Sequence, residues 1–216
     1  MIGTGKALPV SAKCYDQGMP VKVDPAKIRE FKSFEAFYKW LRKHHDKDHE
    51  VWIKVHKLGS GLQSITPKEA IDAALCWGWI DGLRKAFDDK SFLQRYTRRG
   101  KKSVWSQINV QNVARLRNQG KMTEHGLEQV NAAKADGRWK RAYQSGTEMK
   151  LPDDLLAAIQ AEAKARNMLL ELNAQNRYAL AFRVHNMKTE AGRKRKIQTF
   201  VAMLKRGETI YPQRKK

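Results

Sequence analysis

The spacing of apolar residues predicts a helix and then a strand near the start of the chain. In residues 34–41 the apolar side chains recur at helical intervals, and Ser33 before them suits an N-cap. A helix is therefore expected up to about His44. Residues 51–56 alternate between aliphatic side chains and mostly polar ones, which predicts a half-buried strand.

A well-marked helix start and a hairpin follow. Thr66, Pro67 and Glu69 are the residue types of a helix N-terminus with a capping box. Residues 79–87 and 91–97 flank an Asp-Asp-Lys turn, which predicts a β-hairpin. The second strand would place an apolar-leaning set on one face and a polar-leaning set on the other: Phe92, Gln94 and Tyr96 against Leu93, Arg95 and Thr97.

Helical spacing dominates the rest of the chain. Further helix starts are expected at Ser106, Thr123, residues 151–153, Asn173 and Thr189. The pattern indicates an α+β fold, with a small antiparallel sheet packed with helices, followed by a mainly helical C-terminal portion. We expect three regions: an N-terminal arm over residues 1–31 with a short strand at 21–23, an α+β domain over 32–143, and a helical portion over 151–212 that packs on it.

The charge of the chain bears on its partners. The sequence has 43 Lys and Arg against 22 Asp and Glu, which gives a formal net charge of +21 at pH 7. Such a protein attracts polyanions, whether nucleic acid, anionic lipid or an acidic protein. A lysine-rich surface that is only solvated is the alternative, because net charge is informative about partners and not about the fold.

Several kinds of site and location are disfavoured. Cys14 and Cys76 form neither a disulfide framework nor a metal-binding spacing, which fits a reducing compartment. The chain lacks the apolar run of a signal peptide and any stretch of about 18 apolar residues, so we expect a cytoplasmic protein without a membrane span. No catalytic motif or metal signature occurs, so neither a metal nor a cofactor is expected. The same absence disfavours an enzyme but leaves that question open, because catalytic groups can come together only in three dimensions. The oligomeric state stays open.

The first candidate site is a basic loop that leads into a helix N-terminus. Its anion-binding residues would be Arg84, Arg95, Arg98, Arg99, Lys101, Lys102, Trp105 and Ser106. A helix start offers free N–H groups and the positive end of the helix dipole, and an exposed Trp105 would be a platform for a base. The leading hypothesis is therefore binding of nucleic acid, tested best with a short single strand, with a steep salt dependence.

The second hypothesis is a small-molecule pocket, enzymatic or not, in the Trp- and Arg-rich stretch at residues 75–109. Its residues would be Trp77, Trp79, Asp81, Arg84, Arg95 and Tyr96. A carboxylate close to arginines stays ionised and orients them, and the arginines suit a phosphate or carboxylate ligand. In the competing structural interpretation, Trp77 and Trp79 belong mainly to the core and Asp81 forms a structural ion pair.

The last expected helix is also basic. Its cations outnumber Glu190 and Glu208, and they are Lys188, Arg193, Lys194, Arg195, Lys196, Lys205 and Arg206. A basic amphipathic helix can meet nucleic acid or an anionic membrane surface. Alternatively, it packs its narrow apolar stripe on the domain and leaves its charges in water.

Several of these motifs resemble one known family. Residues 73–82 (AALCWGWIDG) are similar to the signature of the bacterial YdeI / OmpD-associated family, which is also labelled bacteriocin-protection. Further similar positions are residues 94–97, 105–106, 109, 120–123, 136–139, 176–178 and 193–207. The resemblance covers roughly residues 33–212. It departs from the family at Arg98, where a proline is expected, and this bears on the shape of the basic loop.

The resemblance implies a function only in outline. The family's labels imply a link to tolerance of bacteriocins or antimicrobial peptides and to an outer-membrane porin. They imply no reaction and no catalytic residues. A third hypothesis is therefore a protein-interaction module that acts in such tolerance.

Overall fold

The computed structural model describes residues 21–144 and 149–213. The chain divides into two compact units at the boundary between Ala142 and Tyr143. We call residues 21–142 the N-terminal unit and the described residues from Tyr143 onward the C-terminal unit. Most of the predicted N-terminal arm, residues 1–20 with Cys14, lies outside the described residues.

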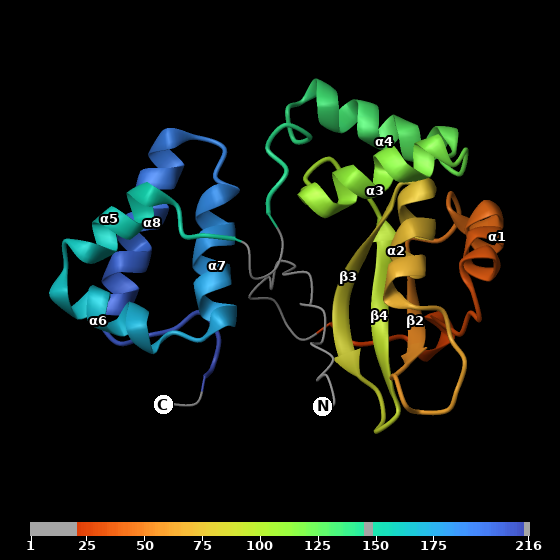
Figure 1. Ribbon diagram of the computed structural model, residues 1–216, viewed down its shortest axis with the longest axis horizontal. Coiled ribbons are helices and arrows are strands. Elements are labelled where there is room, and N and C mark those ends of the chain that lie inside the picture. Colours follow the sequence, from red (N-terminus) through yellow and green to blue (C-terminus); the bar gives the residue numbers. More distant parts are fainter. Residues whose placement is uncertain (1–20, 145–148, 214–216) are drawn as a thin grey trace, which may run out of the picture. The chain divides into compact units, whose positions relative to one another are not determined.

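A four-stranded sheet organises the N-terminal unit (Figure 1). Its strands are β1 (Ile28–Arg29), β2 (Glu50–His56), β3 (Trp79–Ala86) and β4 (Ser91–Arg98). In the order β1-β2-β4-β3, the last three strands are antiparallel, whereas the short β1 is parallel to β2. The predicted hairpin is confirmed as β3 and β4. The prediction of a strand at residues 21–23 is wrong, because these residues form no strand. Asp24, which follows them, caps the 3₁₀ helix η1 (Pro25–Lys27), and β1 comes after this helix.

Four helices accompany the sheet, and they are α1 (Phe34–His44), α2 (Pro67–Cys76), α3 (Gln107–Asn118) and α4 (Glu124–Ala135). Each begins at its predicted cap. The side chains of Ser33, Ser106 and Thr123 each accept a hydrogen bond from a backbone N–H of the first turn. Thr66 and Glu69 form the predicted capping box. The caps satisfy N–H groups that have no partner within the helix, which is why these boundaries can be predicted locally.

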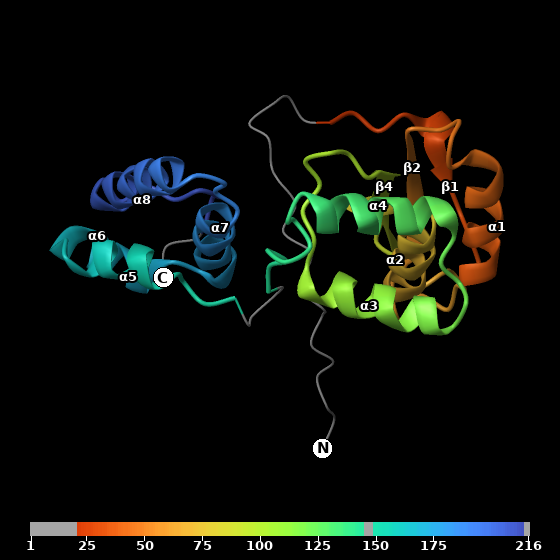
Figure 2. The ribbon, with the colours of Figure 1, turned by 90° about the horizontal axis from the view of Figure 1, so that it is seen from above.

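The helices pack on one face of the sheet, which we call the helix face (Figure 2). The register of β2 and β4 places three residue pairs on this face: Val51 with Tyr96, Ile53 with Gln94, and Val55 with Phe92. Strand residues of this face form one core with Phe37 and Leu41 of α1 and Leu75 of α2. The predicted assignment of Phe92, Gln94 and Tyr96 to one face is therefore confirmed.

The opposite face, which we call the back face, is crossed by the segment before β1 (Figure 2). Lys85 on β3 donates a hydrogen bond to the Val21 carbonyl, and Lys27 forms an ion pair with Glu50 on β2 at 2.9 Å. Trp52 is 0% exposed on this face, so β2 is buried on both sides and not half-buried as predicted. The alternation of apolar and polar residues could not predict this burial, because an indole side chain suits a buried face as well as a solvent-exposed one.

The C-terminal unit is built from α5 (Asp153–Gln160), α6 (Ala163–Glu171), α7 (Ala174–His185) and α8 (Glu190–Lys205). Its buried apolar residues, among them Leu155, Leu180 and Phe200, form a separate core. The α+β fold with a helical C-terminal portion is thus confirmed. The sequence does not predict α6 as a separate helix, because its N-cap residue, Glu162, is not of a residue type that usually caps a helix.

Two polar side chains tie the C-terminal unit together. Asn176 on α7 is buried, and its amide both donates to the Tyr211 carbonyl and accepts from the Tyr211 N–H, at 3.1 and 2.9 Å. Arg193 on α8 makes two hydrogen bonds to Asp154 on α5 and one to the Val184 carbonyl of α7. Asn176 belongs to the 176–178 motif and Arg193 to the 193–207 motif. Both therefore make contacts that stabilise the fold of this unit.

Candidate functional site

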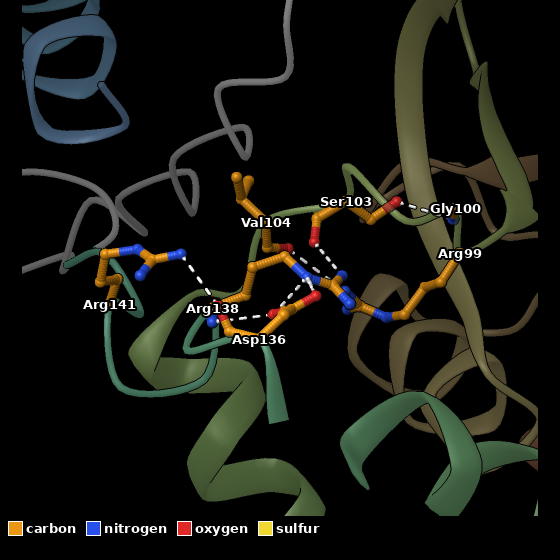
Figure 3. Close-up of polar contacts among 7 residues, drawn as sticks. All are labelled: Arg99, Gly100, Ser103, Val104, Asp136, Arg138 and Arg141. Carbon is orange, nitrogen blue, oxygen red and sulfur yellow. Dashed lines mark hydrogen bonds and ion pairs between the residues drawn. The ribbon is translucent and has the colours of Figure 1, made fainter. Parts of the chain in front are cut away.

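The basic loop between β4 and α3 contains a turn closed by its own hydrogen bonds (Figure 3). The Gly100 N–H donates to Ser103 Oγ at 3.0 Å, and the Ser103 N–H donates to the Gly100 carbonyl at 2.9 Å. At the start of the loop, the Arg99 N–H donates to the Gly78 carbonyl at 3.0 Å. The loop is therefore held at its base and across its turn.

Arg138, which follows α4, holds this turn from outside the loop (Figure 3). Its Nη1 donates to the Ser103 carbonyl at 2.8 Å, and its Nε pairs with Asp136 at 2.7 Å. The backbone N–H and then the guanidinium of Arg138 lower the pKa of Asp136. Arg138 is buried, and these bonds replace its lost hydration. Sequence reasoning missed Arg138, because Ser103 is 35 positions away along the chain.

Trp105 is not the exposed platform that the sequence suggests. Its side chain is only 2% exposed, and Trp139 packs beside it with ring centroids 4.8 Å apart. The guanidinium carbon of Arg99 lies 3.6 Å from the centroid of the Trp105 ring, and Arg99 is itself buried. Trp105 does stack on a cation, but that cation belongs to the same chain. The prediction of an exposed stacking residue is therefore wrong.

The other predicted arginines lie in different surroundings. Arg98 Nε donates to the Asp48 carbonyl at 2.9 Å. Arg95 lies on the back face, where it forms an ion pair with Glu50 at 2.5 Å. Arg84 lies on the helix face, because it is opposite Gln94 in the pairing of β3 with β4 and Gln94 is on that face. The predicted arginines therefore do not line one surface with Trp105.

The exposed part of the loop lies in a segment that has no acidic residues. No Asp or Glu occurs between Asp89 and Glu124, a segment that includes the whole loop and α3. Within it, Lys101 and Lys102 are exposed. Ser106 is buried and caps α3 as predicted. The two lysines therefore precede the positive end of a helix dipole with no carboxylate in the segment to oppose them. A scan of the sequence for acid-free runs could have found this signal.

A second cluster of polar side chains lies on the helix face of the β3–β4 hairpin. Asp81, Arg84 and Tyr96 of the predicted pocket share this face with Gln94, which sequence reasoning missed. Arg84 Nε donates to Gln94 Oε1 at 2.9 Å. Burial raises the pKa of Tyr96 well above its usual value, and Asp81 raises it further while Arg84 opposes the shift. Burial also lowers the pKa of Arg84, against the effects of Tyr96 and Asp81.

The remaining residues of the predicted pocket do not join this polar cluster, although Trp79 lies two positions before Asp81 on the same face of β3. Arg95 is on the back face, as described above. Trp77 and Trp79 are buried in the core, which agrees with the structural interpretation of these two residues. Trp79 Nε1 donates to the His45 carbonyl at 3.3 Å. Of the six predicted residues, the fold therefore groups Asp81, Arg84 and Tyr96.

Ion pairs neutralise much of the charge on and just after α8. The pairs are Arg193 with Asp154, Lys194 with Glu190, Lys205 with Glu162, and Arg206 with Glu208, at 2.6 to 2.9 Å. The apolar stripe of the helix, with Ile197, Phe200 and Leu204, is buried in the core. This helix fits the interpretation in which its apolar face packs on its own unit.

Three further observations concern metals, thiols and membranes. Across residues 21–144 and 149–213, no group of three or more His, Cys, Asp or Glu side chains is placed to hold a metal ion. Cys76 is a buried free thiol whose pKa burial raises to about 12, so it is a poor nucleophile. In the described part of the chain, the helices are too short or too polar to span a bilayer.

Two family models match the chain. Residues 148–207 match the family described as "Bacteriocin-protection, YdeI or OmpD-Associated", and residues 29–129 match "Domain of unknown function (DUF8412)". The first match supports the suspected family over the C-terminal unit, where the 176–178 and 193–207 motifs lie. The motif at residues 73–82 lies in the region of the second match. No curated protein and no solved structure matches the chain.

Proposed function

We propose that this protein, whose C-terminal unit carries a YdeI or OmpD-associated domain, binds polyanions, nucleic acid first, through the basic loop. The observation that carries the proposal is the exposed pair Lys101 and Lys102 in the acid-free segment between Asp89 and Glu124. Contacts to phosphates release counterions and read no base sequence, so such binding depends steeply on salt. We expect it in the cytoplasm, the location inferred from the sequence.

The contacts within the loop support binding by a preorganised surface. The turn at residues 100–103 is closed by its own hydrogen bonds, and Arg138 holds the Ser103 carbonyl from outside. A surface that is already ordered loses less conformational entropy when a phosphate group binds to it. The two lysine side chains extend from this fixed backbone.

The buried position of Trp105 changes which nucleic acid is expected to bind best. Stacking on a base needs an accessible aromatic face, and Arg99 already covers a face of Trp105. Without stacking, affinity should follow the density of phosphate charge, which is higher along a duplex than along a single strand. We therefore expect a duplex to bind at least as tightly as a single strand of the same length.

Fluorescence anisotropy with labelled duplex and single-stranded oligonucleotides, over a series of salt concentrations, tests the proposal. The logarithm of the binding constant should fall linearly with the logarithm of the salt concentration. The double variant Lys101→Ala/Lys102→Ala should bind more weakly and lower that slope by roughly 1.8, because each lost phosphate contact contributes about 0.9.

A matched control removes the same charge elsewhere. Lys194→Ala/Lys205→Ala deletes two lysines that are in ion pairs with Glu190 and Glu162. This control should keep most of the affinity and of the slope. Equal losses in the two double variants would assign binding to the overall charge and not to the loop. Absence of binding at low salt would overturn the proposal altogether.

The family match favours a second candidate function. The family's description names bacteriocin protection, and a protein-interaction module in such tolerance would need a protein partner. Affinity capture with the full tagged chain, with and without nuclease, separates the two functions. Specific retention of one protein after nuclease treatment favours the interaction module, whereas capture that nuclease abolishes favours nucleic-acid binding.

A further inference from the structure

A β-bulge in β3 brings Asp81 and Arg84 to the same face of the sheet. Asp81 is paired with Tyr96 and Arg84 with Gln94, so the register shifts by one residue between them. In a regular strand, side chains three positions apart point to opposite faces. The extra residue of the bulge instead turns Arg84 to the helix face, on which Asp81 and Tyr96 also lie.

Gln94 supports the bulge and positions Arg84. Its Nε2 donates to the Gly82 carbonyl at 2.7 Å, while its Oε1 accepts from Arg84 Nε at 2.9 Å. The Arg84 guanidinium also lies 4.2 Å from the centroid of the Phe92 ring, which orients its plane. Since Gln94 is buried, these contacts hold Arg84 in one place.

Arg84 has donors left over for a ligand. Among residues 21–144 and 149–213, the bond from Nε to Gln94 is the single hydrogen bond of its guanidinium. Nη1 and Nη2 therefore remain as a planar fork, which matches the two oxygens of a carboxylate. The side chain is partly exposed, so a small solute can reach it.

Tyr96 adds a buried hydroxyl to the same face. The side chain is 0% exposed, and its ring packs edge-on against Phe37 with centroids 5.5 Å apart. Within the described ranges, Tyr96 Oη has no hydrogen-bond partner. Such a group is rare in native proteins and indicates a position where a water or a ligand completes the structure. Asp81, itself buried, is close enough to act electrostatically on both Tyr96 and Arg84.

We propose that Asp81, Arg84 and Tyr96 bind a small molecule that has a carboxylate next to a hydroxyl or ammonium group. The Arg84 fork binds the carboxylate, and Tyr96 Oη and the Asp81 carboxylate bind the adjacent hydroxyl or ammonium group. An anion without that adjacent donor fits less well, because Asp81 repels it. The site is independent of the basic loop, so it does not rest on nucleic-acid binding.

An NMR titration of the full chain with L-lactate, glycine, acetate and inorganic phosphate tests the site. The ¹H–¹⁵N signal of Arg84 Nε should shift at lower concentrations of lactate or glycine than of acetate or phosphate. Arg84→Lys keeps the charge and loses the fork, so it should weaken binding of the preferred probe at least about tenfold.

Tyr96→Phe is the sharpest variant, because it removes the hydroxyl and keeps the ring against Phe37. The fold should be as stable as before or more so, since an unpaired buried hydroxyl is lost. Binding of the preferred probe should nevertheless weaken about tenfold, the typical effect of one hydrogen bond to a charged or polar ligand group. Arg117→Ala removes an exposed arginine of α3 and should bind the probes like the intact protein.

Two results would overturn the proposal. One is the absence of any shift of the Arg84 Nε signal with all four probes. The other is equal probe binding by Tyr96→Phe and the intact protein, which would leave the hydroxyl to a water molecule alone. Weaker binding by Tyr96→Phe at unchanged thermal stability would support it.

Discussion

The basic loop and the basic helix α8 are both rich in lysine and arginine, yet the fold places these cations in different surroundings. In and just after α8, four cations are paired with carboxylates, as Arg193 is with Asp154. In the loop, Arg99 is buried against Trp105, and Lys101 and Lys102 stay exposed in a segment that has no acidic residues. The loop therefore presents two exposed lysines in a segment that has no carboxylate, whereas four cations in and just after α8 are paired.

The difference follows from the chemistry of the two cationic side chains and from what lies within their reach. A guanidinium is planar and weakly hydrated, so it can be buried when it stacks and donates in fixed directions, as Arg99 and Arg138 do. An ammonium group is a more strongly hydrated point charge, and Lys101 and Lys102 are exposed to water. A basic stretch thus indicates an anion-binding surface only after its arginines have been placed.

The largest effect is expected from truncation of Trp105. Trp105→Ala should lower the free energy of unfolding by about 3–5 kcal/mol, because it leaves a cavity in the core and removes the surface on which Arg99 stacks. Urea unfolding followed by tryptophan fluorescence measures this in the N-terminal unit alone, since all six tryptophans lie between Trp40 and Trp139.

Ile108→Ala is the control for this experiment, because Ile108 is 52% exposed on the neighbouring helix. It should change the free energy of unfolding by less than about 0.5 kcal/mol. If Trp105→Ala cost no more than this control, Trp105 would be a surface residue after all, and the contrast between loop and helix would fail.

Removal of Arg138 should have the next largest effect. Arg138→Ala deprives the Ser103 carbonyl and Asp136 of their partner, so we expect a loss of about 1–3 kcal/mol. Hydrogen exchange at the Ser103 N–H should also become faster, because the turn is then held by its own bonds alone. Lys140→Ala, at an exposed position nearby in sequence, should change neither quantity.

The ion pair between α8 and α5 should make a smaller, pH-dependent contribution. Hydrogen bonds from Arg193 lower the pKa of Asp154 below its usual 3.8, so the stabilisation is fully present above that pH and is lost as the pH falls through the lowered pKa. Because Asp154 is largely exposed, the contribution is at most about 1 kcal/mol.

Circular dichroism of urea unfolding at several pH values checks this prediction. The difference in stability between the intact protein and Asp154→Asn should be constant near neutral pH and should shrink below about pH 4. A difference that does not change with pH would show that the pair contributes nothing.

The smallest effect is expected at Lys194, whose ion pair with Glu190 is exposed to solvent. Lys194→Ala should change the free energy of unfolding by less than about 0.5 kcal/mol. It should also leave the salt dependence of nucleic-acid binding unchanged, whereas Lys101→Ala should reduce it. A larger effect of Lys194→Ala on binding would place the polyanion surface on α8.

Much of the secondary structure could be predicted because its signals are local. The caps at Ser33, Thr66, Ser106 and Thr123 act on N–H groups of the same turn, so their positions in the sequence are their positions in the fold. The hairpin of β3 and β4 follows from alternation around one short turn. Helix α6 has no such cap and was not predicted.

The sites depend on contacts between residues far apart in the chain, so the tertiary structure decided them. In the sequence Trp105 lies near several cations, but only the fold shows that the guanidinium of Arg99, from the same chain, stacks on its ring. Alternation would put Arg84 and Asp81 on opposite faces, and the bulge supported by Gln94 reverses this. By itself the sequence determined the net charge, the acid-free segment and most helix starts. Which cations are buried, paired or free depends on burial and geometry, which no local pattern specifies.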